Sequence, residues 1–472
     1  MTVAGFFCLA LLLRACGLAV ADIQVDWTSD DSIRKAASVL AADSMGYYEG
    51  DQPGKVPGLL YDKPDPNLWW WAGGVLFGTM IEYAHYAGDN KYNEVTRVAM
   101  THQAGGNQDF LTPNWTAHMG NDDQGFWGLS AMSAAELNFE NPPPNEPQWL
   151  STAQGTFNTM AHPDRHDDEC GGGLRWQINA YSQGYRYKNS ISNGLFFNLG
   201  ARLARYTGNA TYQDWAVKTW DWERRVGLMD DDYAVYDGAW TNDNCGKIET
   251  SQYTYNAGVW LHGAAFMFNH TNGSPEWQKR VEGLLDHMLA KFFPKKIAIE
   301  TVCQNDEVNK CRRDTLIHKG VVHRWLANVA QLAPFTAAKI TPVLQESAKA
   351  AVRQCTGGES GRQCGFQWTT GKYDGTANVA TEMSVLSAVL SVLSAKGVAP
   401  SLVTERSGGT SKGDTSAGSG SRAMTPRKHA PITTAGRAGA GIITLILVVC
   451  LVGTLVFMVS DHDVDIRTWV KG

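Results

Sequence analysis

The chain has 472 residues, enough for one large domain or two of ordinary size. Charged residues make up 19% and the net charge is −6, so the chain lacks the basic field of a nucleic-acid-binding protein, and no such partner is expected. Trp (17), Tyr (16) and Phe (16) are abundant, often beside Gly, Asn or Asp. Aromatic rings stack on the C–H face of a sugar, although most simply fill a core.

The N-terminus has the pattern of a secretory signal peptide over residues 1–21. An apolar run from Val3 to Leu13 is followed by Ala19-Val20-Ala21, a small-x-small cleavage pattern. Four N-x-Ser/Thr sequons agree with passage through the secretory pathway and predict glycosylation at Asn114, Asn209, Asn269 and Asn272. We therefore expect a protein of the secretory pathway whose folded domain faces the extracellular side.

Six cysteines remain once those in the two apolar terminal segments are set apart: Cys170, Cys245, Cys303, Cys311, Cys355 and Cys364. An even set in a secreted chain predicts disulfides, and the sequence allows many connectivities. The simplest connectivity pairs the cysteines that are close in sequence, Cys303 with Cys311 and Cys355 with Cys364, and leaves Cys170 to pair with Cys245. No CxxC spacing suggests zinc, and neither a metal ion nor a cofactor is expected.

The C-terminal region changes composition twice. Residues 401–437 are rich in Ser, Gly and Thr, which predicts a flexible linker after a folded domain at 22–400. Residues 438–459 then form an apolar run long enough to cross a bilayer, followed by a polar tail at 460–472. The run is either a membrane span, which the polar tail favours, or the tail of a GPI signal, which the basic residues before it favour.

The folded region shows helical periodicity almost throughout. Apolar residues recur every three or four positions in twelve segments: 30–45, 69–87, 91–106, 122–137, 148–162, 190–206, 211–227, 252–269, 275–293, 316–332, 340–354 and 377–396. Only short runs such as Lys296–Val302 and Tyr233–Tyr236 have the pattern of strands. The sequence therefore predicts an all-α domain.

The connections between these helices alternate in length. Short turns with Gly at 86–90, 206–210 and 270–274 alternate with long loops at 47–67, 107–121, 163–189, 228–251, 294–315 and 355–376. This weak repeat of helix, short turn, helix and long loop predicts six helical hairpins closed into an (α/α)6 barrel. The long loops would share one face, where a groove would form the natural site.

Two adjacent carboxylates are the strongest candidates for chemistry. Asp122 and Asp123 lie in the run GNDDQGFW, after a long loop and at a helix start. Retaining glycosidases hold two carboxyl groups roughly 5–5.5 Å apart, which neighbouring residues reach easily, whereas inverting enzymes need roughly 6.5–9.5 Å. The alternative is that such residues only cap the helix and complement its dipole.

Other groove candidates are polar or aromatic residues at the starts of helices. We expect substrate contacts from Trp70, Trp71, Trp127, Trp176, Asn189, Asn193, Asp237, Tyr255, Asn256, Lys319 and Arg324. For the amide residues, helix capping is an equal alternative. The His/Asp/Glu cluster at 162–169 has two His at i, i+4, but a solvated loop is favoured over a metal site.

Several runs resemble fungal mannan endo-1,6-α-mannosidases of glycoside hydrolase family 76. They include LWWWAGGVLFGTMIEY (68–83), GNDDQGFWGLSAMSAAE (120–136), CGGGLRWQI (170–178), KNSISNGLFFNLGARLARYTGN (188–209), YAVYDGA (233–239), QYTYNAGVWLHGAAFM (252–267) and KGVVHRWL (319–326). The resemblance spans about residues 24–396. It implies an (α/α)6 barrel and retaining chemistry on α-1,6-mannosyl linkages in fungal cell-wall biogenesis.

The resemblance also implies roles and partners. Asp122 would be the nucleophile and Asp123 the general acid/base. The donor would be α-1,6-mannan or a GPI-anchor glycan, and a transglycosidase would move it onto cell-wall glucan. We expect a monomer attached to the membrane through the C-terminal segment. A different hypothesis is a non-catalytic mannan-binding wall protein on the same fold.

Overall fold

The protein's structure, a computed structural model, describes residues 23–60, 68–112, 118–305, 310–420 and 433–459. The chain divides into a large unit, Met1–Met424, and a small unit, Thr425–Gly472. The predicted signal peptide, the sequon at Asn114 and the polar tail at 460–472 lie outside the described residues. The other three sequon asparagines are exposed, so their predicted glycosylation is sterically open.

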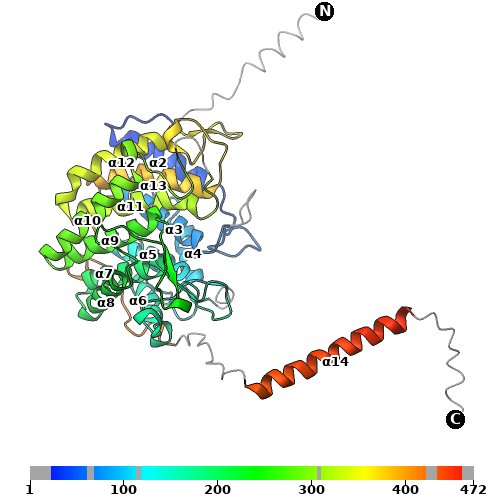
Figure 1. The fold of residues 1–472 in the computed structure, drawn as a ribbon. Helices are drawn as coiled ribbons and strands as arrows, with labels where there is room; N and C mark the ends of the chain where they lie inside the picture. The colour runs from blue at the N-terminus through cyan, green and yellow to red at the C-terminus, as the bar shows by residue number, and fades with distance from the viewer. Residues whose placement is uncertain (1–22, 61–67, 113–117, 306–309, 421–432, 460–472) are drawn as a thin grey trace, which may run out of the picture. The chain divides into compact units, whose positions relative to one another are not determined.

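The described part of the large unit contains twelve α-helices, at the twelve predicted segments (Figure 1). They are α2 (Asp30–Met45), α3 (Trp71–Ala87), α4 (Asn93–Ala104), α5 (Asn121–Glu136), α6 (Trp149–Met160), α7 (Ser190–Thr207), α8 (Ala210–Val226), α9 (Thr254–His270), α10 (Pro275–Phe292), α11 (Thr315–Leu332), α12 (Ala337–Val352) and α13 (Val379–Ala395).

Six of these helices form a closed inner ring. In the order α3, α5, α7, α9, α11, α13, each contacts the next, and α13 contacts α3. The other six pack outside this ring. For example, α2 packs against both α13 and α3, and α6 packs against both α5 and α7. The predicted (α/α)6 barrel is confirmed.

Burial explains which helices lie inside. In α3 nearly every residue is buried, and its side chains are apolar or small almost all round, as a helix enclosed by neighbours requires. Outer helix α8 buries one face through Tyr212, Ala216, Thr219 and Trp220, spaced every three or four residues. Full burial of a large apolar side chain contributes roughly 1.5–3 kcal/mol, so the outer helices are held mainly by such faces.

Two small antiparallel sheets lie in the long loops. One orders β1 (Tyr187–Asn189), β2 (Gly238–Trp240) and β3 (Ile248–Glu249); the other pairs β4 (Cys355–Gly357) with β5 (Gln363–Cys364). The strand-like runs at 233–236 and 296–302 are not strands, so that prediction was wrong. In the run 233–236 Val235 forms a single isolated bridge, with Met229, and the run 296–302 belongs to no strand, so neither has the partner strand that a ladder needs.

The simplest disulfide arrangement is confirmed. Cys170–Cys245 joins two long loops 75 residues apart, while Cys303–Cys311 and Cys355–Cys364 each close a short loop. All three bonds lie in the long loops between helices. They therefore stiffen the segments that surround the ends of the inner helices.

The predicted flexible linker is wrong in its first half. Residues 402–419, here called the strap, pack on the barrel and bury Leu402, Ser411 and Ala417. The backbone N–H of Val403 donates to the Glu136 carbonyl oxygen. A Ser/Gly/Thr composition permits this because small side chains let the strap backbone lie close to helix surfaces, where backbone hydrogen bonds replace side-chain packing.

The strap runs along α6 from the start of that helix to its end, toward the long loops. Ser411 accepts from the backbone N–H of Leu150 at the start of α6, and Gln154 in its middle accepts from the Asp414 N–H. Near the end of the helix, Asn158 donates to the carbonyl oxygens of Thr415 and Ala417. The Gly418 N–H then reaches the carbonyl oxygen of Asn107, in the long loop before α5.

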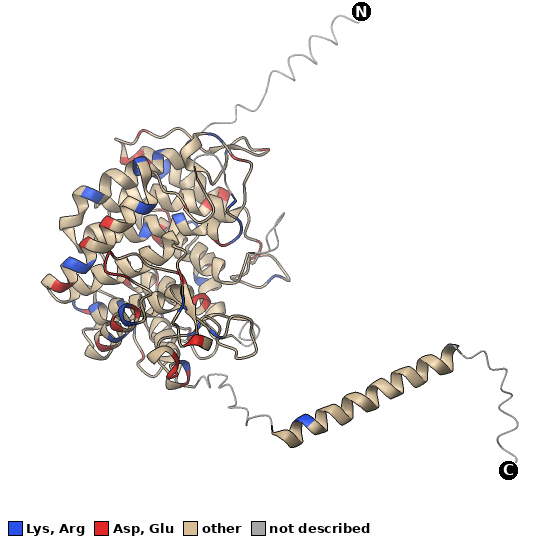
Figure 2. Ribbon diagram, viewed as in Figure 1, with Lys and Arg blue, Asp and Glu red and all other residues tan. Residues whose placement is uncertain are grey.

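The small unit contains helix α14 (Thr434–Val459), apolar apart from Arg437 near its start (Figure 2). By length and composition the segment Thr434–Met458 is the one membrane-span candidate among the described residues, with mean hydropathy 2.8 in its most apolar 18-residue window. Its described side chains are exposed within its own unit. In the large unit, by contrast, both signs of charge are interspersed over the helices.

Gly418→Val is expected to detach the end of the strap. Gly418 has φ +76°, and a Cβ would lie 2.5 Å from the Gly155 carbonyl oxygen, so the side chain has no room. Amide exchange in residues 411–420 should become faster while the helices of the barrel keep their protection. Lys412→Ala, at an exposed strap position, is the control and should leave exchange unchanged. Unchanged exchange in Gly418→Val would contradict the packing described.

Candidate active site

A cavity of about 250 Å³ opens at the N-terminal ends of the inner helices. Its lining combines carboxyl groups with aromatic rings: Trp71, Asp122, Asp123, Phe126, Trp176, Tyr187, Asn189, Asp237, Tyr253, Tyr255, Asp314, Thr315 and His318. Most of these residues lie at or close to the starts of α3, α5, α7, α9 and α11, while Trp176 and Asp237 come from the long loops that precede α7 and α9. The long loops therefore meet at one face, as their lengths predicted.

The carboxyl pair is held by backbone contacts at the start of α5. The Gly120 N–H donates to Asp123 Oδ2 at 2.7 Å, and the Asp123 N–H donates to Asp122 Oδ1 at 3.0 Å. The Asn121 N–H donates to the Trp176 carbonyl oxygen at 2.8 Å, which places the Trp176 side chain beside Asp122. Helix capping and a possible chemical role thus coexist in the same two residues.

Burial dominates the electrostatics of this pair. It raises the pKa of Asp123 to about 7. The hydrogen bond from Gly120 acts to lower this pKa, whereas the negative charge of Asp314 acts to raise it. Burial and the neighbouring Asp123 also raise the pKa of Asp122 well above its ordinary value, while N–H donors and Trp176 act in the opposite direction. The two carboxyls can therefore share a proton near neutral pH.

Strand β1 sends alternate side chains to opposite sides. Tyr187 and Asn189 line the cavity, whereas Lys188 between them is fully buried on the other side. The Tyr187 hydroxyl donates to Asp237 Oδ2 at 2.7 Å, and Asn256 Nδ2 lies 3.4 Å from Asp237 Oδ1. Burial nevertheless raises the pKa of Asp237. The sheet thus positions a third carboxyl in the cavity.

Helix α11 contributes residues that the sequence reasoning missed. Asp314 Oδ1 accepts from the Trp71 indole at 3.1 Å. The His318 ring stacks on Tyr255 with centroids 3.8 Å apart, and its Nδ1 lies 3.2 Å from buried Glu300. Asp314 lies at the end of the long predicted loop 294–315, two residues before the predicted helix 316–332, and Asp122 lies at the corresponding junction of the loop 107–121 with its predicted helix. That signal was in the sequence, and the same placement rule would have found it.

The predicted site residues divide into two groups. The cavity is lined by Trp71, Asp122, Asp123, Trp176, Asn189, Asp237 and Tyr255, and Asn256 supports it through Asp237. The prediction that the remaining five also line it was wrong; they are Trp70, Trp127, Asn193, Lys319 and Arg324. All five have burial and partners that give them other roles.

Two of these five are aromatic core residues. Trp70 stacks on Trp127 with centroids 5.2 Å apart, and its indole donates to Gln103 at 2.8 Å. The Trp127 indole donates to the Trp70 carbonyl oxygen at 3.2 Å, and Trp127 is fully buried. Trp69, the first Trp of the run, is 55% exposed instead. Consecutive residues of a helical turn point in different directions, so the Trp side chains of this run cannot all face the cavity.

The other three satisfy polar groups inside the barrel. Asn193 exchanges hydrogen bonds with the backbone of Leu174 at 2.8 and 3.0 Å. Arg324 pairs with buried Glu82 at 2.9 Å. Lys319 donates to the Phe366 carbonyl oxygen and lies over the Trp368 ring at 4.3 Å, and burial lowers its pKa well below the ordinary value.

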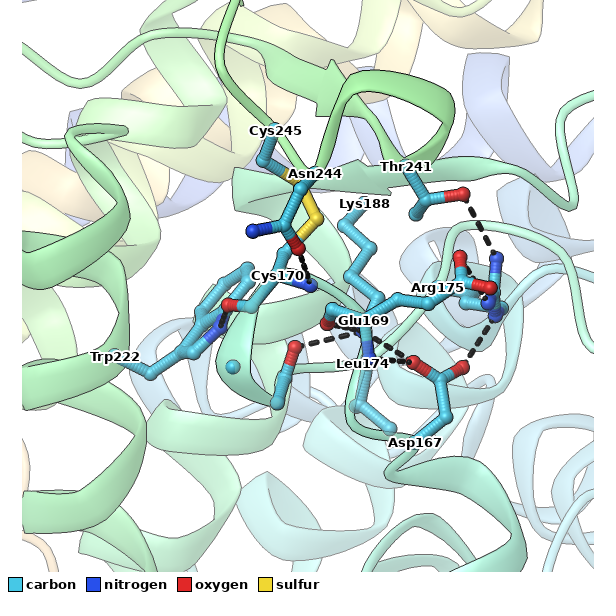
Figure 3. A network of polar contacts seen from close by, with 12 residues as sticks. Asp167, Glu169, Cys170, Leu174, Arg175, Lys188, Trp222, Thr241, Asn244 and Cys245 are labelled. Carbon is cyan, nitrogen blue, oxygen red and sulfur yellow. Dashed lines mark hydrogen bonds and ion pairs between the residues drawn. A yellow bond between two sulfur atoms is a disulfide. The ribbon is translucent and has the colours of Figure 1, made fainter.

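The His/Asp/Glu cluster is partly an ion-pair network rather than a solvated loop, which corrects the favoured interpretation (Figure 3). Asp167 accepts from Arg175 Nε at 2.6 Å and from Lys188 Nζ at 2.8 Å, and Glu169 accepts from Arg175 at 2.9 Å. Burial opposes ionisation of Asp167, but these cations hold its pKa below the ordinary value. The described residues include no group of three or more side chains suited to a metal ion.

An (α/α)6 barrel with paired carboxyls in an aromatic cavity has the architecture of a glycoside hydrolase. The family model for "Glycosyl hydrolase family 76" matches residues 32–405. The chain belongs to this family and is a glycoside hydrolase. Its membership agrees with the resemblance seen in the sequence.

Relatives match nearly the whole chain. Mannan endo-1,6-alpha-mannosidase DCW1 of Saccharomyces cerevisiae is 42% identical over 93% of this chain and 95% of its own length. Mannan endo-1,6-alpha-mannosidase DFG5 of the same yeast is 38% identical over 92% and 94%. The protein thus falls in the fungal DCW1/DFG5 group.

Solved structures confirm the fold. The crystal structure of Dfg5 from Chaetomium thermophilum in complex with glucosamine has a TM-score of 0.81 and 46% identity, covering 87% of this chain and 100% of that one. An inactive variant of the α-1,6-mannanase GH76A of Salegentibacter, in complex with α-1,6-mannotriose, has a TM-score of 0.62. It is 16% identical over 78% of this chain and 99% of that one, so it bears on the fold alone.

Gly120→Ala is expected to lower activity without unfolding the protein. A Cβ at this position would lie 2.1 Å from Asp122 Oδ1, so the carboxyl group must move. Displacement of a reacting group by about 1 Å can cost roughly 100-fold in rate. We expect kcat/KM on an α-1,6-mannoside to fall strongly with little change in Tm. Gly106→Ala is the control, because a Cβ there meets nothing within 4 Å. Full activity of Gly120→Ala would contradict the packing.

Proposed function

We propose that this protein is a retaining endo-1,6-α-mannosidase or transglycosidase of the fungal cell wall. The observation that carries the proposal is the placement of Asp122 and Asp123 together in a cavity with aromatic walls. The names of the relatives support α-1,6-mannosyl linkages as the substrate. A signal peptide at 1–21 and apolar helix α14 support a membrane-attached enzyme with an extracellular-facing catalytic domain.

In this mechanism Asp122 attacks the anomeric carbon. The bond to the leaving oxygen breaks while Asp123 gives that oxygen its proton, leaving a mannosyl ester on Asp122. Asp123 then takes a proton from the incoming hydroxyl group, which displaces Asp122. Water as acceptor gives hydrolysis, and a sugar hydroxyl, such as one on cell-wall glucan, gives transfer of a mannan or GPI-glycan donor.

Hydrogen bonding supports this division of roles. Asp122 accepts from the Asp123 N–H and from Trp176, whereas Asp123 accepts from the Gly120 N–H. More donors favour the ionised form, as a nucleophile requires. Burial acts against this at Asp122, so its ionised form depends on those donors and on the positive charge that develops on the sugar in the transition state.

The walls of the cavity support sugar binding. Trp71 and Phe126 stack with centroids 4.5 Å apart, and Trp176 is partly exposed. Tyr187, Asn189 and Tyr255 add hydroxyl and amide groups for sugar hydroxyls. Aromatic faces with a few fixed polar groups are the usual composition of such sites.

Asp122→Asn and Asp123→Asn should both lose turnover of α-1,6-mannan oligosaccharides, by at least about 100-fold, while remaining folded by circular dichroism. The two variants should differ on a mannoside with an activated leaving group. That substrate needs no acid assistance, so Asp123→Asn should form the glycosyl-enzyme and Asp122→Asn should not. A mechanism-based inactivator should label Asp122 in the wild type.

The competing hypothesis, a mannan-binding protein without chemistry, makes the opposite forecast. It requires binding without product and no labelled Asp122. Assays should monitor both hydrolysis and transfer, using mannan oligosaccharides and a GPI-type glycan with a glucan acceptor. An active Asp122→Asn enzyme would rule out the proposed mechanism.

The pH profile follows from Asp123. Because burial raises the pKa of its carboxyl to about 7, the proton needed by the leaving group is present below that pH and lost above it. We therefore expect kcat/KM to decline as pH rises through about 7. A profile that stays flat from pH 6 to 9 would contradict Asp123 as the acid.

A further inference from the structure

Asp314 is an acidic residue of the cavity that the two-carboxylate mechanism does not use. It comes from the start of α11, across the ring from the acid pair on α5. Asp237, the other additional carboxyl, is occupied by the hydroxyl of Tyr187 and lies near the amide of Asn256. Asp314 is bound differently, since its Oδ1 accepts a hydrogen bond from the Trp71 indole.

A continuous wall joins Asp314 to Asp123. Trp71 donates to Asp314 Oδ1 at 3.1 Å, and the other side of the same indole packs on Phe126 at 4.5 Å. Phe126 is three residues after Asp123 and therefore on the same face of α5. Asp123 and Asp314 thus border one partly dehydrated space, in which charges interact more strongly than in water.

The groups around Asp314 leave its charge only partly compensated. His318 lies one turn further along α11, but its Nδ1 faces Glu300 and its ring stacks on Tyr255. Arg313 is adjacent in sequence and exposed to solvent, where its charge is screened. From α5 the facing charged groups are Asp122 and Asp123 themselves. The negative charge of Asp314 therefore acts mainly on the neighbouring carboxyl groups of Asp122 and Asp123.

We propose that Asp314 is a positioning residue for the acid/base step, whose carboxylate sustains the proton affinity of Asp123 through both half-reactions. The inference rests on the proposed roles of the acid pair. In the first half-reaction, Asp123 passes its proton to the leaving oxygen. Asp122 then becomes an ester and loses its negative charge, so it no longer helps Asp123 to act as a base.

Burial raises the pKa of Asp314, while the nearby His318, the Trp71 hydrogen bond and Arg313 favour its ionised form, and Asp314 forms no ester when Asp122 does. The second half-reaction requires Asp123 to remove a proton from the incoming water or sugar hydroxyl. A carboxylate that is never esterified can support this step when Asp122 cannot. Asp314 therefore acts most on breakdown of the glycosyl-enzyme, and the Trp71 hydrogen bond fixes its position.

The test is the pH profile and pre-steady-state kinetics of the full-length Asp314→Asn enzyme on α-1,6-mannan oligosaccharides. Removing a negative charge lowers the pKa of Asp123, so the alkaline limb of kcat/KM should move to lower pH by roughly 0.5–1 unit. Glycosyl-enzyme should also accumulate as a burst with an activated mannoside. Asp314→Glu should restore the limb and remove most of the burst.

Controls separate this role from sugar binding and from misfolding. Trp71→Phe keeps the charge of Asp314 and an aromatic wall but removes the indole N–H that holds Asp314, so it should raise KM and move the limb less than Asp314→Asn does. Asp231→Asn removes a fully exposed carboxylate and should move nothing. An Asp314→Asn enzyme that is folded, with a raised KM but an unshifted limb and no burst, would overturn the inference.

The failure of the proposed function would look different. If Asp123→Asn retained full activity, the acid/base assignment itself would fall. If Asp123 proves essential and the limb ignores Asp314, only the present inference falls. Azide, which needs no deprotonation, should rescue breakdown of the glycosyl-enzyme in Asp314→Asn if the slow step is base catalysis, and absence of rescue would count against it.

Discussion

The contact between α13 and α3 closes the inner ring, and the site depends on that closure. A closed ring brings the starts of five of its helices to one cavity, although those starts are as far apart in sequence as Trp71 and Thr315. No single loop builds the site. Five of the six inner helices contribute between one and three side chains at or beside their starts, the long loops add the rest, and tight packing of the ring fixes their positions.

Burial then decides the chemistry of the carboxyl pair. The positive end of α5 favours ionised carboxylates, but a helix dipole contributes about 0.3–1 kcal/mol, less than one pKa unit. Withdrawal from water can raise a carboxyl pKa by several units. The second effect wins at Asp123, where the pKa reaches about 7. Walls of Trp71, Phe126 and Trp176 therefore have an electrostatic as well as a stacking role.

The strap continues the packed part of the large unit beyond α13, its last described α-helix. It leaves α13, crosses to α6 and follows that helix until Gly418 meets Asn107 in the loop before α5. The described part of the large unit therefore ends near the long loops that border the cavity, and not at the end of its last helix. Strap contacts are chiefly hydrogen bonds between the strap backbone and side chains of the barrel such as Gln154, Asn158 and Arg205, and backbone contacts of this kind leave no signal in the composition, which therefore resembles that of a linker.

The sequence by itself determined the twelve helices, their alternating connections and the adjacency of the two acids, because these follow from periodicity, Gly positions and neighbouring places along the chain. For the disulfides it offered only the simplest of many connectivities, and the structure decided for that one. Only the tertiary structure decided which polar residues face the cavity. Lys319 and Arg324 lie on an inner helix with His318, yet they point to Phe366 and Glu82 inside the barrel, while His318 reaches the site. A helix that is buried on every side has no polar stripe in its sequence, so the sequence does not show in which direction each of its side chains points. Ring closure, a non-local contact, sets that direction.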